Sequence, residues 1–168
     1  MMTLNELIST RRSIREYQDK PLDRDLLNAV LEAGRLAPSA RNRQDWHFTA
    51  VENPALHQQM IEACCDQPSV AQAPVTLVIW MNEESVMHCK QSAATIDGSI
   101  ALSFMMLKAA ELGLGTCWLG HFDADKVKAV LGLPEKAVVV AVTPLGWPDE
   151  SPDAKPRKSA EEVFDYRV

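Results

Sequence analysis

The chain has 168 residues, of which 46% are hydrophobic and 24% are charged. This length and composition predict one domain spanning residues 1–168, and they exclude a disordered, collagen-like or low-complexity chain. The formal net charge of −6 disfavours nucleic acid and anionic membranes as partners. Any anion that the protein binds must therefore be held by a local cluster of cations.

The four cysteines have neither the density nor the spacing of a disulfide-stabilised secreted domain. The first dozen residues contain no apolar run of signal-peptide length. The longest apolar stretch, residues 93–114, is interrupted by three charged side chains, which favours a buried helix over a membrane span. We therefore expect a cytoplasmic protein.

Local patterns in the first half of the chain predict both helices and strands. Thr3 and Glu6 have the spacing of a capping box, and Asn53 and Pro54 are typical of a helix start. Together with the apolar periodicity, these patterns predict a helix from Thr3 toward Arg11, a helix over 23–36, a loop over 38–45, a strand over 47–52, a helix from 53 to near 66 and a strand over 74–81 that is buried on both faces.

The segment from about residue 90 to 112 is apolar nearly all round its helical wheel, which predicts a helix that is buried on all sides. One small domain covers only part of such a helix, so we expect a second copy to cover the rest.

Gly113 and Gly115 are expected to end that helix as C-cap glycines. The remaining patterns predict a short strand over 116–119, a helix over 123–131 closed by Gly132, a central strand over 137–145, and an extended tail ending in a short helix or edge strand over 163–166.

Two basic segments are candidates for binding an anion. Residues 11–15 hold three arginines and Ser13, and guanidinium forks match the oxygens of a phosphate. The alternative is that these cations only compensate a helix C-terminus. The second segment contains Lys155, Arg157 and Lys158, and taken alone it favours a solvated tail. The two segments form one site if the tail folds back onto the first helix.

Two further segments carry polar or glycine-rich patterns. The loop from Pro38 to Trp46 concentrates hydroxyl, amide and guanidinium groups suited to reading the edge of a heteroaromatic ring, or to satisfying its own turns. Residues 113–120 contain three glycines but match neither the dinucleotide fingerprint nor the P-loop. The histidines and cysteines show no metal-ligand spacing, and we expect no metal.

Taken in order, these segments resemble the nitroreductase family of FMN-dependent oxidoreductases, of which this chain is a short member. The resemblance covers almost the whole chain. It is carried by the residues 11–15 (Arg-Arg-Ser-Ile-Arg), 37–44, the strand after Ala73-Pro74, the helix through Asp97, the residues 113–118 (Gly-Leu-Gly-Thr-Cys-Trp) and the residues 156–158 (Pro-Arg-Lys).

The resemblance implies an α+β fold with a mixed central sheet flanked by helices, assembled as an intertwined homodimer with FMN at the subunit interface. It implies that the phosphate and ribityl chain are held by one subunit and that the 38–42 loop of the partner lies along the flavin, with residues 115–120 passing the ring. The implied cofactor-binding residues are Arg11, Arg12, Ser13, Arg15, Pro38, Ser39, Arg41, Asn42, Gly120, Arg157 and Lys158.

The implied reaction is a ping-pong cycle in which NAD(P)H gives hydride to flavin N5 and an electron-poor acceptor then takes the reducing equivalents. A nitroaromatic, a quinone and an activated alkene are all candidate acceptors, and no side chain is identified as a catalytic acid or base. Asp45 departs from the family pattern, which usually has proline there, and a carboxylate near reduced flavin is expected to lower its potential. Two alternatives stay open: a specialised enzyme acting on one substrate or on flavin itself, and a flavin-binding dimer without turnover.

Overall fold

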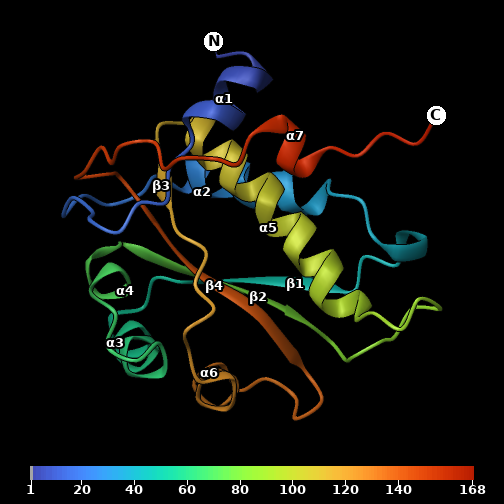
Figure 1. Ribbon diagram of the computed structural model, residues 1–168. Coiled ribbons are helices and arrows are strands. Elements are labelled where there is room, and N and C mark those ends of the chain that lie inside the picture. Colours follow the sequence, from blue (N-terminus) through green and yellow to red (C-terminus); the bar gives the residue numbers. More distant parts are fainter. Residues whose placement is uncertain (1) are drawn as a thin grey trace.

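A four-stranded sheet forms the centre of the computed structural model, which describes residues 2–168 (Figure 1). The strands lie in the order β1 (Trp46–Val51), β2 (Val75–Met81), β4 (Val138–Gly146) and β3 (Gly115–Thr116). All three strand pairs are antiparallel. The expected mixed sheet is therefore wrong for these strands, and the parallel contribution within residues 2–168 is one bridge between Ser13 and Thr116.

Helices cover both faces of this sheet (Figure 1). One face carries α2 (Arg24–Arg35) and α5 (Ala93–Glu111), and the other carries α3 (Pro54–Ala63), α4 (Pro68–Gln72) and α6 (Ala124–Leu131). The short helices α1 (Leu4–Thr10) and α7 (Ala160–Val163) lie near the chain ends. The predicted α+β fold with a central sheet between helices is confirmed.

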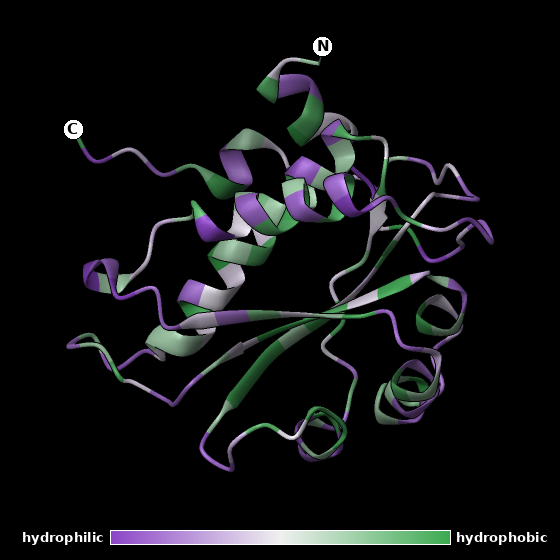
Figure 2. Cartoon of the chain, turned by 180° about the vertical axis from the view of Figure 1, so that it is seen from behind, coloured by the Kyte–Doolittle hydropathy of each residue, from purple (hydrophilic) through white to green (hydrophobic). Residues whose placement is uncertain are grey.

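The alternation of side chains along β2 builds two hydrophobic cores. Leu77 and Ile79 pack with α2 and α5, whereas Val78 packs with α3 and α6. All three side chains are 0–1% exposed, as predicted for a strand buried on both faces. Figure 2 shows hydrophobic residues concentrated on the strands between the helical layers.

Helix caps fall at the residues that the sequence indicates. Thr3 and Glu6 form the predicted capping box, and the Asn53 side chain accepts hydrogen bonds from Ala55 N and Leu56 N. Gly132 closes α6 in the left-handed conformation, with φ +62°. These short-range hydrogen bonds are set by neighbouring residues, which is why the sequence alone locates them.

Three boundaries differ from the predictions. The helix expected to reach residue 66 ends at Ala63, and α4 follows as a separate helix, because Cys65 and Asp66 take positive φ angles of 56° and 55°. Gly115 is not a C-cap but a residue of β3, where a Cβ atom would lie 2.8 Å from Ile14 Cβ. The short tail helix begins at Ala160, earlier than expected.

Helix α5 is buried on the side that packs on β2 and β4, but its opposite side is open. Leu102 and Met105 are 0% exposed, whereas Phe104 is 43% exposed and Ile96 and Ile100 are half-buried. One protomer therefore covers only part of α5, as expected for a domain of this size. By length and composition α5 could also span a membrane, and half of its apolar window is buried inside the protein.

Candidate functional site

The basic segment that follows α1 is fixed in an extended conformation between β3 and the tail. Ile14 is buried, and its N–H donates to Thr116 O at 2.9 Å. Tyr17 is also buried and its hydroxyl donates to Ile14 O at 2.6 Å. Because Ile14 and Tyr17 are buried and hydrogen-bonded, they hold in place the backbone that carries Arg11, Arg12 and Arg15.

The tail crosses this basic segment and encloses a cavity of about 590 Å³. Five cationic side chains and one carboxylate are among the lining residues, which are Ile8, Ser9, Arg11, Arg12, Ser13, Arg15, Pro152, Asp153, Ala154, Lys155 and Arg157. The two basic segments, from opposite ends of the chain, therefore meet at one cavity. This concentration of positive charge contrasts with the net charge of −6.

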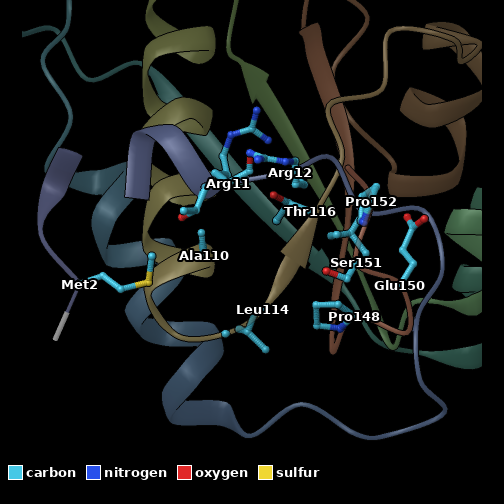
Figure 3. A pocket seen from close by; sticks show the side chains of 13 residues that line it. Met2, Arg11, Arg12, Ala110, Leu114, Thr116, Pro148, Glu150, Ser151 and Pro152 are labelled. Carbon is cyan, nitrogen blue, oxygen red and sulfur yellow. The ribbon is translucent and has the colours of Figure 1, made fainter. Parts of the chain in front are cut away.

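A second cavity of about 240 Å³ adjoins the first and shares Arg11 and Arg12 with it. In Figure 3 these arginines lie above Thr116, and Leu114 and Pro148 lie below it. Arg12 Nη1 donates to Ser9 O at 2.8 Å, so this arginine partly compensates the C-terminus of α1. Arg11 Nη1 is buried and has no hydrogen-bond partner among residues 2–168. A buried guanidinium nitrogen without an acceptor is costly, and an anion would relieve that cost.

Glu150 joins the tail to the basic segment. Its carboxylate accepts hydrogen bonds from the backbone N–H groups of Arg15 and Glu16. Asp149 N donates to Glu16 O at 2.9 Å, which extends the connection. The carboxylate thus occupies backbone donors and leaves the arginine side chains available to a ligand.

The polar loop after α2 lies at the other end of α5. Ala40 N donates to both carboxylate oxygens of Asp97, at 3.0 and 3.1 Å. Ala110, which lines the second cavity, is thirteen positions after Asp97 in α5, and this spacing corresponds to about 20 Å along the helix axis. One protomer therefore does not bring the polar loop and the basic cavity together.

The family model "Nitroreductase family" matches residues 8–91 and, in a second alignment, residues 64–147. The chain belongs to the nitroreductase family.

Relatives in this family are similar over most of their length. A Thermus thermophilus protein named NADH dehydrogenase is 31% identical over 189 residues, covering 94% of this chain and 92% of the relative. The Bacillus subtilis FMN reductase that uses NAD(P)H is 28% identical, covering 95% and 73% of the two chains. The crystal structure of a nitroreductase family protein from Clostridium novyi is 32% identical, with a TM-score of 0.83 and coverage of 92% and 89%. The chain is accordingly a nitroreductase-family NAD(P)H oxidoreductase, and the family implies the use of flavin and NAD(P)H.

The expected cofactor residues of this nitroreductase-family chain fall into three places. The large cavity collects Arg11, Arg12, Ser13, Arg15 and Arg157, but Lys158 is not among its lining residues. The remote loop holds Pro38, Ser39, Arg41 and Asn42. Gly120 follows β3 on an exposed stretch, where a Cβ atom would meet no described atom within 4 Å.

Asp45, the departure from the family pattern, forms an ion pair with Arg43 at 2.6 Å. Its negative charge is therefore compensated within the loop. The family pattern identified Asp45 as unusual but did not indicate its partner Arg43. A salt bridge between residues two apart depends on the path of the backbone.

Buried titratable groups lie below the basic cluster. Burial raises the pKa of the Cys117 thiol, and the nearby Arg15 charge and a hydrogen bond with Ser13 offset part of this increase. Burial likewise raises the pKa of Tyr17. Both groups are thus neutral at pH 7 and do not add negative charge under the arginines.

Sequence reasoning missed Tyr17, Glu150 and the hydrogen bonds between Ala40 N and Asp97. The apolar ring of Tyr17, three residues after Ile14, is the sequence feature that could have indicated its burial. Glu150 is one acid in a polar tail, and no local pattern distinguishes it. Among residues 2–168, no three His, Cys, Asp or Glu side chains are grouped so that they could hold a metal.

Proposed function

We propose that the protein is a homodimeric FMN-dependent oxidoreductase that passes hydride from NAD(P)H through flavin N5 to an electron-poor acceptor by a ping-pong mechanism in the cytoplasm. The acceptor is a nitroaromatic, a quinone or an activated alkene. The observation that carries the proposal is the cavity of about 590 Å³ in which Arg11, Arg12, Arg15, Lys155 and Arg157 converge.

The donor set of this cavity fits a phosphate dianion. Each arginine offers a planar fork of N–H donors, and charge-assisted hydrogen bonds to a phosphate contribute about 1.5–3 kcal/mol each. The buried Arg11 Nη1, which has no acceptor within residues 2–168, supplies a donor that the protein itself leaves unused. The named FMN reductase relative supports FMN as the phosphate-bearing ligand.

A second copy is required to complete the proposed site. The loop with Ser39, Arg41 and Asn42 lies about 20 Å along the axis of α5 from the second cavity, which shares two arginines with the larger basic cavity. A twofold axis across the open face of α5 would bring each cavity to the loop of the other copy, since an isologous interface pairs each patch with its counterpart.

Exposed apolar residues support this dimer. Phe104 is 43% exposed on α5, and Phe164 and Tyr166 are 58% and 78% exposed in the tail after α7. Large apolar side chains in an extended tail gain little from their own protomer. In the proposed dimer the tails wrap the second copy and bury these side chains.

The flavin supplies the hydride chemistry when bound, and the protein supplies its position and charge environment. The cationic cavity would hold the phosphate through Arg11, Arg15 and Arg157, with Ser13 as a further donor. The loop of the second copy would offer the Ser39 hydroxyl and the Asn42 amide to the ring edge. Gly120 leaves the backbone open to a flat group, and we assign no side chain as proton donor.

The test begins with the colour of the purified protein and the identity of the flavin released on denaturation. We expect a yellow dimer that releases FMN rather than FAD, and that oxidises NADH or NADPH faster with a quinone or a nitroaromatic than with oxygen alone. A colourless protein whose apo form binds no added FMN would refute the proposal. Flavin reduction too slow to support turnover would favour the binding dimer, and loss of FMN during turnover would favour an enzyme that consumes flavin.

A further inference from the structure

The buried carboxylate of Asp97 has no role in the proposed site as described above. We infer that Asp97 is a positioning residue: it holds the loop from Ser39 to Gln44 in the conformation that presents Ser39, Arg41 and Asn42 to the flavin bound by the second copy. This inference rests on the proposed function and adds to it the residue that sets the loop's position.

The surroundings of Asp97 make it costly as a mere packing residue. It lies in α5 at 5% exposure, and both of its oxygens share a single donor, the N–H of Ala40. Within the described part of the chain, no cation forms an ion pair with it. A protein with such a sparsely paired buried carboxylate is usually less stable than the same protein with an apolar residue of similar volume at that position. The presence of Asp97 therefore indicates that its hydrogen bond with Ala40 N–H serves to hold the loop.

The loop that Ala40 begins needs such an anchor. Arg41, Asn42 and Gln44 have φ angles of 55°, 54° and 56°, the left-handed region that residues with a Cβ atom disfavour. A loop with three such residues in four relaxes unless its ends are fixed. The internal bonds, from Asn42 N to Ser39 O at 2.9 Å and from Gln44 N to Ser39 Oγ at 3.1 Å, shape the loop but do not attach it to the helices.

Among residues 2–168, two donors of this loop bond to side chains of other segments. Arg43 Nη1 donates to Ser85 Oγ at 3.3 Å, in an exposed pair that water can replace. The Ala40 to Asp97 bond is half-buried and ends on α5, whose other end lines the second cavity. Asp97 thus fixes the loop relative to α5, whose open face is the surface on which the second copy docks in the proposed dimer.

The experiment compares wild type with Asp97→Asn and Asp97→Ala. Asn keeps one acceptor oxygen but adds an NH₂ group that needs its own acceptor, so its effect should be smaller than that of Ala. Asp125→Asn is the matched control, because it removes the same charge from an exposed position in α6. Dimer content and thermal unfolding are measured for every variant, so that Asp97→Asn still decides the question if Asp97→Ala does not fold.

The first readout is trypsin cleavage of the apoprotein after Arg41 and Arg43, which needs no flavin. We expect faster cleavage at these exposed sites in both Asp97 variants and an unchanged rate in Asp125→Asn. The second readout is FMN affinity of the dimer, expected to fall about tenfold in Asp97→Asn, as for loss of one charge-assisted hydrogen bond.

Unchanged cleavage at the loop in a folded Asp97 variant would overturn the anchoring role. Faster cleavage with unchanged FMN affinity would overturn the link between anchor and flavin while leaving the proposed function intact. A wild-type protein that binds no FMN would overturn the proposed function itself, and the inference with it. Faster cleavage together with weaker FMN binding in a stable dimer would support the inference.

Discussion

The packing of α5 on β4 gives a prediction about the free energy of unfolding. The sign of the change distinguishes overpacking of a close contact from a gain in helix propensity. Gly98 lies in the second turn of α5, next to Asp97, and is buried. A Cβ atom placed there would lie 2.9, 3.0 and 3.1 Å from Val140 Cγ2, Cγ1 and Cβ. Val140 is β-branched and stiff at χ1, and its Cβ cannot rotate away. Gly98→Ala therefore forces α5 away from the sheet by a few tenths of an ångström.

The magnitude is a difference of two terms. Replacing glycine with alanine inside a helix stabilises it by about 1 kcal/mol. Overpacking a close contact costs roughly 1–3 kcal/mol. We expect a net loss of about 1 kcal/mol in the free energy of unfolding. In the Val140→Ala background, where both Cγ atoms are gone, the same substitution should be neutral or stabilising, with a coupling of about 1–2 kcal/mol.

The assay is urea unfolding of the four proteins of this cycle, followed by circular dichroism at 25 °C. One protomer concentration is used throughout, because self-association would make the apparent stability depend on concentration. If Gly98→Ala is as stable as wild type or more so, helix propensity outweighs the contact and the packing argument is wrong. Additive single and double variants would likewise refute the role of Val140.

Three further predictions follow from the site and the buried groups. Arg15→Ala should weaken FMN binding by 1.5–3 kcal/mol, about 10- to 150-fold in fluorescence titrations, whereas Lys158→Ala, outside the cavity lining, should leave it nearly unchanged. Phe104→Glu, at the open face of α5, should give monomers by sedimentation, and an intact dimer would exclude this face. Burial raises the pKa of Cys64 to about 12, so a thiol reagent at pH 8 should label the exposed Cys65 and Cys89 but reach Cys64 only after unfolding. Because that raised pKa favours the neutral thiol in the folded state, stability should fall as the pH rises above the unfolded thiol's value, and stability that is constant from pH 8 to 10 would contradict the shift.

Features set by neighbouring residues could be predicted from the sequence. The caps at Thr3, Asn53 and Gly132 and the apolar run of β2 each depend on a few adjacent positions. The separation of α3 from α4 could not be predicted, because Cys65 adopts a positive φ without being glycine. Strand direction was also missed, since pairing between distant strands is fixed by the sheet as a whole.

The residues of the candidate site also fall into those that the sequence indicates and those that it does not. Charge clusters are visible in a sequence, and the basic segments at residues 11–15 and 155–157 do meet at one cavity. The carboxylates that organise the surroundings are not visible. Glu150 accepts from backbone groups 134 and 135 residues away, and Asp97 accepts from one 57 residues away. An acid that serves a distant backbone N–H leaves no local pattern by which to recognise it.

The Arg43–Asp45 ion pair changes what the unusual carboxylate can do. A lone charge near a flavin would act at long range, but a pair 2.6 Å apart is a dipole whose field falls off faster with distance. Both side chains are also partly exposed, at 44% and 35%, so solvent screens them. Arg41 has no acidic partner among residues 2–168, so it is the cation of this loop whose charge is not compensated. In the proposed dimer the loop therefore brings positive rather than negative charge to the flavin, and Asp45 acts on the loop's path more than on the flavin's potential.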